Sequence, residues 1–133
     1  MRIEELKELR KLSMEIRSKY EILKEARLSA YRINNILSAT PKGKNGEGFS
    51  TAILNAMSIA EEMKETVIKL TEKYTKKYKE AKEEIEKLEE LQEKLILELR
   101  YLSNKKWDEI ARIMNFSKRR IFQIHDRALK RLQ

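Results

Sequence analysis

The sequence has no cysteine among its 133 residues, and it has only one proline and three glycines. The lack of cysteine excludes a disulfide framework, a Cys-based zinc site and a catalytic thiol. No apolar run is long enough for a transmembrane helix or a secretory signal, so we expect a cytoplasmic protein with no membrane partner. The single histidine, His125, has no second histidine or cysteine with which to bind a metal. We therefore predict neither metal nor cofactor.

Charged residues make up 39% of the chain and hydrophobic residues 41%. A mixture rich in Glu, Lys, Leu and Ile is typical of long helices and coiled coils, so we predict an all-α protein. The three glycines and the proline all lie in residues 40–50, which form the only strong break in helical periodicity. Ser50 is a suitable N-cap for the helix that follows, and we expect that helix to continue to about Leu102.

Apolar residues recur every seven positions on both sides of this break, which predicts a coiled-coil seam. The earlier row is Leu9, Ile16, Leu23, Ala30 and Leu37, and the later row is Ile53, Ala60, Val67, Tyr74, Ala81, Leu88, Leu95 and Leu102. Because the loop at 40–50 is short, the helices should pair antiparallel. The expected pairs are Leu37–Ile53, Ala30–Ala60, Leu23–Val67, Ile16–Tyr74 and Leu9–Ala81. We predict a coiled-coil hairpin domain at 1–88 and a second domain at 89–133.

A two-helix hairpin leaves apolar side chains outside its seam, and here they are Ile22, Ile33, Ile36, Ile59, Met63 and Leu70. Such a surface needs a partner, and a second copy of the chain is the simplest one. We therefore expect a homodimer.

The formal net charge is +8, and it is unevenly distributed. From residue 103 to the end there are nine positive and three negative residues, which gives +6 and leaves +2 for the rest of the chain. This asymmetry points to an anionic partner for the C-terminal segment, and nucleic acid is the natural candidate.

Two helices with a tight turn between them are predicted in this segment. Trp107, Ile110, Ala111 and Met114 have the spacing of one helical face. Asn115 and Phe116 form the turn, and Ser117 caps the last helix. On that helix the predicted inner face is Ile121, Ile124, His125, Ala128 and Leu132. This is the layout of a helix-turn-helix.

The opposite side of the last helix is predicted to bind double-stranded DNA. Arg and Gln side chains there can form paired hydrogen bonds with guanine and adenine edges, while Lys and the other Arg residues suit phosphate. The expected DNA-binding residues are Lys118, Arg119, Arg120, Phe122, Gln123, Arg127, Lys130, Lys105 and Lys106.

The segment ELRYLSNKKWDEIARIMNFSKRRIFQIHDRALKRL resembles the promoter-reading helix-turn-helix at the C-terminal end of bacterial sigma factors. It is more similar still to the module W-E-E-I-A…S-R-R…Y-R-I-H-G-R-A-L of small phage regulators of the ArpU/RinA late-transcription type. The matching residues are Trp107, Glu109, Ile110, Ala111, Ser117, Arg119, Ile124, His125, Arg127, Ala128 and Leu129. Asn104 and Asp126 stand where the pattern has glycine. The resemblance implies a phage or prophage regulator that binds promoter-proximal DNA and contacts RNA polymerase.

No nucleophile–base pair, phosphate-binding loop or metal cluster is present, so we expect a protein that is not an enzyme. The leading interpretation is a sequence-specific DNA-binding transcription regulator. The alternative is a protein-interaction module that binds RNA polymerase or a sigma factor and has little DNA affinity of its own.

Overall fold

The computed structural model describes residues 1–39 and 46–133, and it describes side chains outside residues 37–50. Within these residues the chain is helical and has no strand, which confirms the predicted all-α class. The elements are α1 (Ile3–Ala39), α2 (Gly46–Glu86), α3 (Leu91–Leu97), the π-helical segment η1 (Glu98–Leu102), α4 (Trp107–Met114) and α5 (Lys118–Leu132). None of the described helices combines the length and apolar character needed to cross a lipid bilayer.

The chain forms two compact units, and α1 and α2 contribute to both of them. The hairpin unit is Met14–Glu72. The terminal unit comprises Met1–Ser13 and Lys73–Gln133, so it joins the first turns of α1 to the end of α2 and to every later helix.

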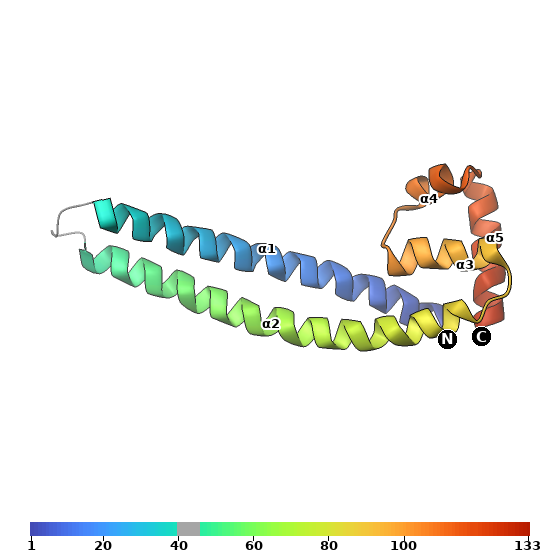
Figure 1. Ribbon diagram of the computed structural model, residues 1–133, viewed down its shortest axis with the longest axis horizontal. Helices are drawn as coiled ribbons and strands as arrows, with labels where there is room; N and C mark the ends of the chain where they lie inside the picture. The colour runs from blue at the N-terminus through green and yellow to red at the C-terminus, as the bar shows by residue number, and fades with distance from the viewer. Residues whose placement is uncertain (40–45) are drawn as a thin grey trace. The chain divides into compact units, whose positions relative to one another are not determined.

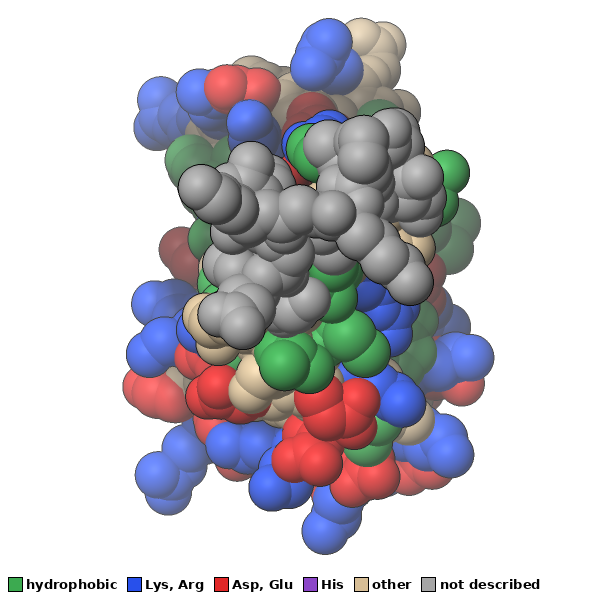
Figure 2. All heavy atoms as spheres, turned by 90° about the vertical axis from the view of Figure 1, so that its left-hand side faces the viewer, with side chains coloured by type: hydrophobic (Ala, Val, Ile, Leu, Met, Phe, Trp, Pro, Cys, Tyr) green, Lys and Arg blue, Asp and Glu red, His purple; other side chains and the backbone are tan. Residues whose placement is uncertain are grey.

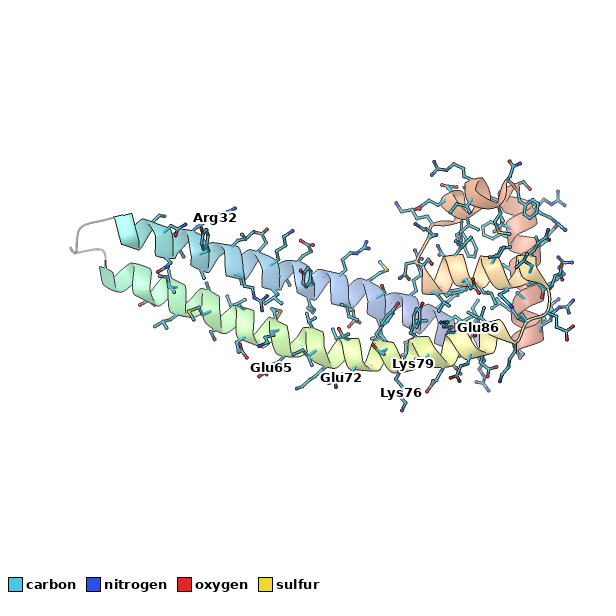
Figure 3. All side chains as sticks on the ribbon, viewed as in Figure 1. Arg32, Glu65, Glu72, Lys76, Lys79 and Glu86 are labelled. Carbon is cyan, nitrogen blue, oxygen red and sulfur yellow. The ribbon has the colours of Figure 1, made fainter. Side chains whose placement is uncertain are left out.

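In the hairpin unit, α1 and α2 lie side by side and antiparallel (Figure 1). Leu23, Ala26 and Ala56 are its buried apolar residues. Charged side chains occupy the outer edges: Figure 3 shows Arg32 on the side of α1 away from α2, and Glu65 on the side of α2 away from α1. Apolar side chains also reach the surface beside charged ones (Figure 2). The unit is therefore a thin pair of helices with little interior.

The terminal unit holds the main core, in two clusters. The larger cluster consists of Leu6, Leu9, Ala81, Ile85, Leu88, Leu97, Tyr101, Ala128 and Leu132. The smaller cluster consists of Ile96, Ile110, Ile121 and Ile124, with Trp107 and Phe116 packed against it. Residues from α1, α2, α3, η1 and α5 meet in the larger cluster, so these elements are packed around one apolar centre.

The second helix is shorter than the sequence indicated. It was expected to continue to about Leu102, but α2 ends at Glu86 and a new helix begins at Leu91. The last turn tightens, because the N–H of Leu88 donates to the carbonyl of Ile85 at 3.1 Å, and Glu90 is extended. No glycine or proline marks this break. Packing accompanies it, since Leu88 of the connection and Leu97 of α3 both enter the larger cluster.

The beginning of the second helix differs as well. It begins at Gly46 rather than after Ser50, so residues 46–50 are helical. The predicted capping by the Ser50 side chain and the position of the Leu37 side chain lie outside the described residues. Leu9 and Ala81 lie in the same buried cluster. The coiled-coil character and the predicted residue pairs stay predictions.

Leu97 and Leu91 offer a matched test of the larger cluster, because both are leucines of α3. Leu97 is fully buried, whereas Leu91 is 64% exposed. We expect Leu97→Ala to lower the free energy of unfolding by about 2–5 kcal/mol, through lost burial and a residual cavity. Leu91→Ala should change it by about 0.5 kcal/mol or less. Chemical denaturation followed by circular dichroism measures both, and equal losses would contradict the described packing.

Candidate nucleic-acid interface

The turn between α4 and α5 sets the direction of the last helix. Asn115 ends α4 in the left-handed region, with φ 56° and ψ 43°, which asparagine tolerates better than most residues. The N–H of Phe116 donates to the carbonyl of Ala111 at 3.0 Å and closes the end of α4. The Ser117 hydroxyl then accepts a hydrogen bond of 3.2 Å from the N–H of Arg120, as an N-cap does. The predicted turn and cap are confirmed.

The inner face of α5 is also as the sequence predicts. Its buried residues are Ile121, Ile124, His125, Ala128 and Leu132. Ile121 and Ile124 pack in the smaller cluster with Ile110 of α4, while Ala128 and Leu132 pack in the larger cluster. The first half of α5 is thus fastened to α4 and α3, and its second half to the remaining core.

His125 is a structural residue within this packing. Its Nε2 lies 2.8 Å from the Tyr101 hydroxyl in a buried hydrogen bond. The Trp107 ring meets it edge-on, with ring centroids 4.9 Å apart. Burial lowers the pKa of His125, and only the neighbouring Asp126 carboxylate, 3.8 Å from Nδ1, draws it upward appreciably. The imidazole is therefore held neutral at pH 7, as a hydrogen-bonding part of the core.

Contacts with α1 and η1 hold the turn before α4. Asn104, which stands where the resembled pattern has glycine, has a positive φ of 56°, and its amide donates to the Ser13 hydroxyl at 2.9 Å. The Arg100 guanidinium lies over the Trp107 ring, 4.3 Å from its centroid, and donates to the carbonyl of Lys105 at 3.1 Å. A cation over an indole face is attracted by the ring quadrupole. These contacts fix the start of α4.

The outer face of α5 is exposed along its whole length. Its exposed residues include Lys118, Arg119, Arg120, Gln123, Asp126, Arg127 and Lys130, and Phe122 is 42% exposed. Lys106 is exposed and Lys105 half-buried in the turn before α4. The structure brings most of the predicted DNA-binding residues to one helix surface, while Lys105 and Lys106 belong to a separate turn.

Ion pairs divide these cations into two groups. Lys118 lies 2.5 Å from Asp108 of α4, and hydrogen bonding and charge from Lys118 lower the pKa of that carboxyl. Arg127 lies 3.9 Å from Glu90, and Lys105 lies 4.0 Å from Glu109. Among the described residues, no ion pair involves Arg119, Arg120, Lys106 or Lys130. The cations without a salt bridge on the first half of α5 are thus Arg119 and Arg120.

A buried carboxylate supports the far end of α5. Glu93 of α3 is fully buried, and its Oε1 lies 3.1 Å from Nε of Arg131. Burial raises the pKa of Glu93, while the charge of Arg131 opposes this shift. Arg131 also lies 3.9 Å from Glu90, so Glu90 faces two arginines of α5. These acids hold the second half of α5 against α3.

The sequence prediction missed the acidic residues Glu90, Glu93 and Asp108, and it missed Arg131 as a partner. Glu93 carries a usable signal, because it stands on the buried side of α3 with Ile96 and Leu97, at helical spacing. A carboxylate on an apolar face requires a cationic partner. The choice among nearby cations depends on the crossing of α3 and α5, which spacing alone does not give. The described residues contain no group of three or more His, Cys, Asp or Glu side chains suited to a metal.

Because His125 is the only histidine, its titration is directly observable. We expect a pKa below the usual value of about 6.5 in the folded protein, as burial disfavours the charged form. As the pH falls below that value, the unfolded chain binds a proton that the folded chain does not, so the free energy of unfolding decreases. Proton NMR of the imidazole measures the pKa. A value at or above 6.5 would contradict the described burial of the imidazole.

The helices of this candidate interface are similar to a known protein family. Residues 85–133 match the family model "Sigma-70, region 4", a DNA-binding helix-turn-helix. The match covers less than half of the chain and contains α3, η1, α4 and α5. No curated protein and no solved structure gives a significant match. The C-terminal segment is therefore similar to the DNA-binding region 4 of sigma-70 factors, which agrees with the predicted sigma-like helix-turn-helix.

Proposed function

We propose that the protein is a sequence-specific DNA-binding transcription regulator, without enzymatic activity, which reads duplex DNA with α5. One observation carries the proposal: α5 buries every residue of its inner face and leaves a cationic outer face in solvent. The similarity of residues 85–133 to a DNA-binding helix-turn-helix supports it. A structural role alone would explain the inner face but would not require this concentration of positive charge.

Each part of the outer face has a role in this proposal. Arg119 and Gln123 are four residues apart, so they lie on the same side of the helix and can hydrogen-bond base edges in the major groove. Arg120 suits phosphate, which fixes position rather than sequence. Lys118 and Arg127 already have acidic partners, Asp108 and Glu90. They must exchange or share those partners to contact phosphate, so they contribute less than their charge implies.

The resemblance to ArpU/RinA-type regulators extends the proposal to a phage or prophage protein that acts near promoters, where it contacts RNA polymerase. A role on promoter DNA also implies a cytoplasmic location. The alternative, a module that binds RNA polymerase or a sigma factor with little DNA affinity, is separated from the proposal by the following experiment.

Replacing Arg119 and Arg120 together by Ala should weaken binding to a selected duplex, because both guanidinium groups are exposed and form no salt bridge in the described chain. Loss of a base-reading arginine costs about 1–3 kcal/mol, and loss of a phosphate contact flattens the salt dependence. Fluorescence anisotropy over a series of salt concentrations measures both.

Arg17→Ala with Arg32→Ala provides the matched control, since it removes the same charge from exposed positions of the hairpin unit. We expect this control to bind like the wild type. Unchanged binding by the Arg119 and Arg120 variant would exclude this interface. A wild-type protein that captures RNA polymerase but binds no duplex would favour the alternative.

We also propose that the hairpin unit forms a homodimer. Nine of the twelve exposed large hydrophobic side chains in the described chain belong to this unit. A pair of helices with so small an interior gains most from burying such residues against another copy.

One side of the hairpin unit is better suited to this contact than the other. At about 100° per residue, one side of the seam carries Ile22, Ile33, Ile59, Met63 and Leu70, with the buried Ala26 and Ala56 at its inner edge, and we call this side the aliphatic face. No charged residue interrupts it between Ile22 and Ile33 of α1, or between Ala56 and Leu70 of α2. The opposite side carries Leu54, Met57 and Ile68 but also Glu61 and Glu65. A second copy on the aliphatic face buries no unpaired charge.

Ile59→Glu and Leu54→Glu test this assignment, because each places a carboxylate at an exposed apolar site of α2. Ile59 is 46% exposed on the aliphatic face, and Leu54 is 64% exposed on the opposite side. We expect a dimeric mass for the wild type and for Leu54→Glu, and a monomeric mass for Ile59→Glu. Light scattering after size exclusion gives the masses. A monomeric wild type would contradict the dimer, and the reverse pattern would contradict the face.

A further inference from the structure

Phe122 is an exception on the outer face of α5. Its neighbours there are charged or amide side chains, yet it leaves 42% of an aromatic side chain exposed. The buried inner face of α5 is complete without it. An exposed aromatic ring on an otherwise cationic helix surface invites the question of what it contacts.

The ring is held in place. Phe122 meets Trp107 edge-on, with ring centroids 5.0 Å apart. Trp107 is itself fixed by the Arg100 guanidinium over its ring at 4.3 Å and by the His125 ring at 4.9 Å. An aromatic side chain has few rotatable bonds, and this support restricts it further, so presenting its exposed part to a ligand costs little conformational entropy.

Its position places the ring beside the proposed base-reading residues. Phe122 follows Arg119 by three positions and Lys118 by four, so it shares their side of the helix. Helical side chains lean toward the N-terminus, which brings the ring over the first turn of α5. In helix-turn-helix proteins the N-terminal residues of the recognition helix meet the base edges. Gln123 is the next residue along the chain.

We propose that Phe122 determines specificity by packing against the 5-methyl group of a thymine in the major groove. This inference rests on the proposed DNA-binding function. The ring has no hydrogen-bonding group, so the base features that remain for it are apolar, and the thymine methyl is the apolar feature of the major groove. Gln123, the next residue along the chain, suits adenine, which carries the complementary hydrogen-bonding groups. Together these residues favour A·T pairs, and the site read by α5 contains a thymine at a fixed position.

The test uses a duplex obtained by random-site selection with the wild-type protein. Each thymine of that duplex is replaced singly by uracil, which removes the methyl group and keeps the hydrogen-bonding edge. We expect one position at which uracil weakens wild-type binding by about four-fold, the value for burying one methyl-sized group. Against the same duplexes, Phe122→Ala should bind more weakly throughout and be insensitive to uracil at that position. Phe122→Leu, which keeps an apolar side chain, should retain part of the sensitivity.

The results distinguish a failure of the proposed role of Phe122 from a failure of the proposed DNA-binding function. If no uracil position weakens wild-type binding, or if Phe122→Ala responds to uracil as the wild type does, the role of Phe122 is overturned while DNA binding stands. If the wild type selects and binds no duplex, the proposed function itself fails. If Phe122→Ala does not fold, the wild-type series still overturns the proposal when no uracil position weakens binding. Phe122→Leu then tests the assignment to this ring, through its reduced sensitivity at that position. Circular dichroism of each variant, with Ile113→Ala at a 57% exposed site of α4 as control, monitors folding.

Discussion

Burial of the inner face of α5 is the constraint on which the terminal unit depends. Ile121 and Ile124 complete one apolar cluster, and Ala128 and Leu132 complete the other. Because both clusters use the same helix, α5 cannot rotate about its axis without exposing apolar surface in two places. The direction of the outer face is therefore fixed by the buried residues of the inner face. The core thus sets the orientation of the surface that we propose to bind DNA.

Ion pairs then divide the cations of α5 into those with an acidic partner and those without one. Three cations of α5 form ion pairs: Arg131 with Glu93 of α3, Arg127 with Glu90 at the N-cap of α3, and Lys118 with Asp108 of α4. These pairs anchor α5 against its neighbours and withdraw charge from its surface. Arg119 and Arg120 have no such partner among the described residues, and Phe122 and Gln123 adjoin them. The first two turns of α5 thus combine the free cations, the amide and the exposed ring, which is the chemical variety that base recognition requires.

The hairpin unit presents a different physical problem, because it has apolar residues without a sufficient interior. Leu23, Ala26 and Ala56 are buried, whereas Ile22 and Ile59 are exposed. Because the aliphatic face is uninterrupted and the outer edges are charged, a second copy should associate through that face only. If two copies join there, each assembly carries two α5 helices. DNA with two half-sites would then be bound more tightly than a single half-site, as a consequence of valency.

The sequence by itself determined the helical class, the boundaries of α4, the turn at Asn115, the cap at Ser117 and both faces of α5. These features follow from local periodicity and capping chemistry, which act within a few residues. Only the tertiary structure decided that α2 ends at Glu86, that Glu93 is buried against Arg131, and that Lys118 is paired with Asp108. The residues between Glu86 and Leu91 include no helix breaker, and the charged side chains have several partners within reach. Their outcome depends on how helices distant in sequence pack, and that is set by burial of the shared core.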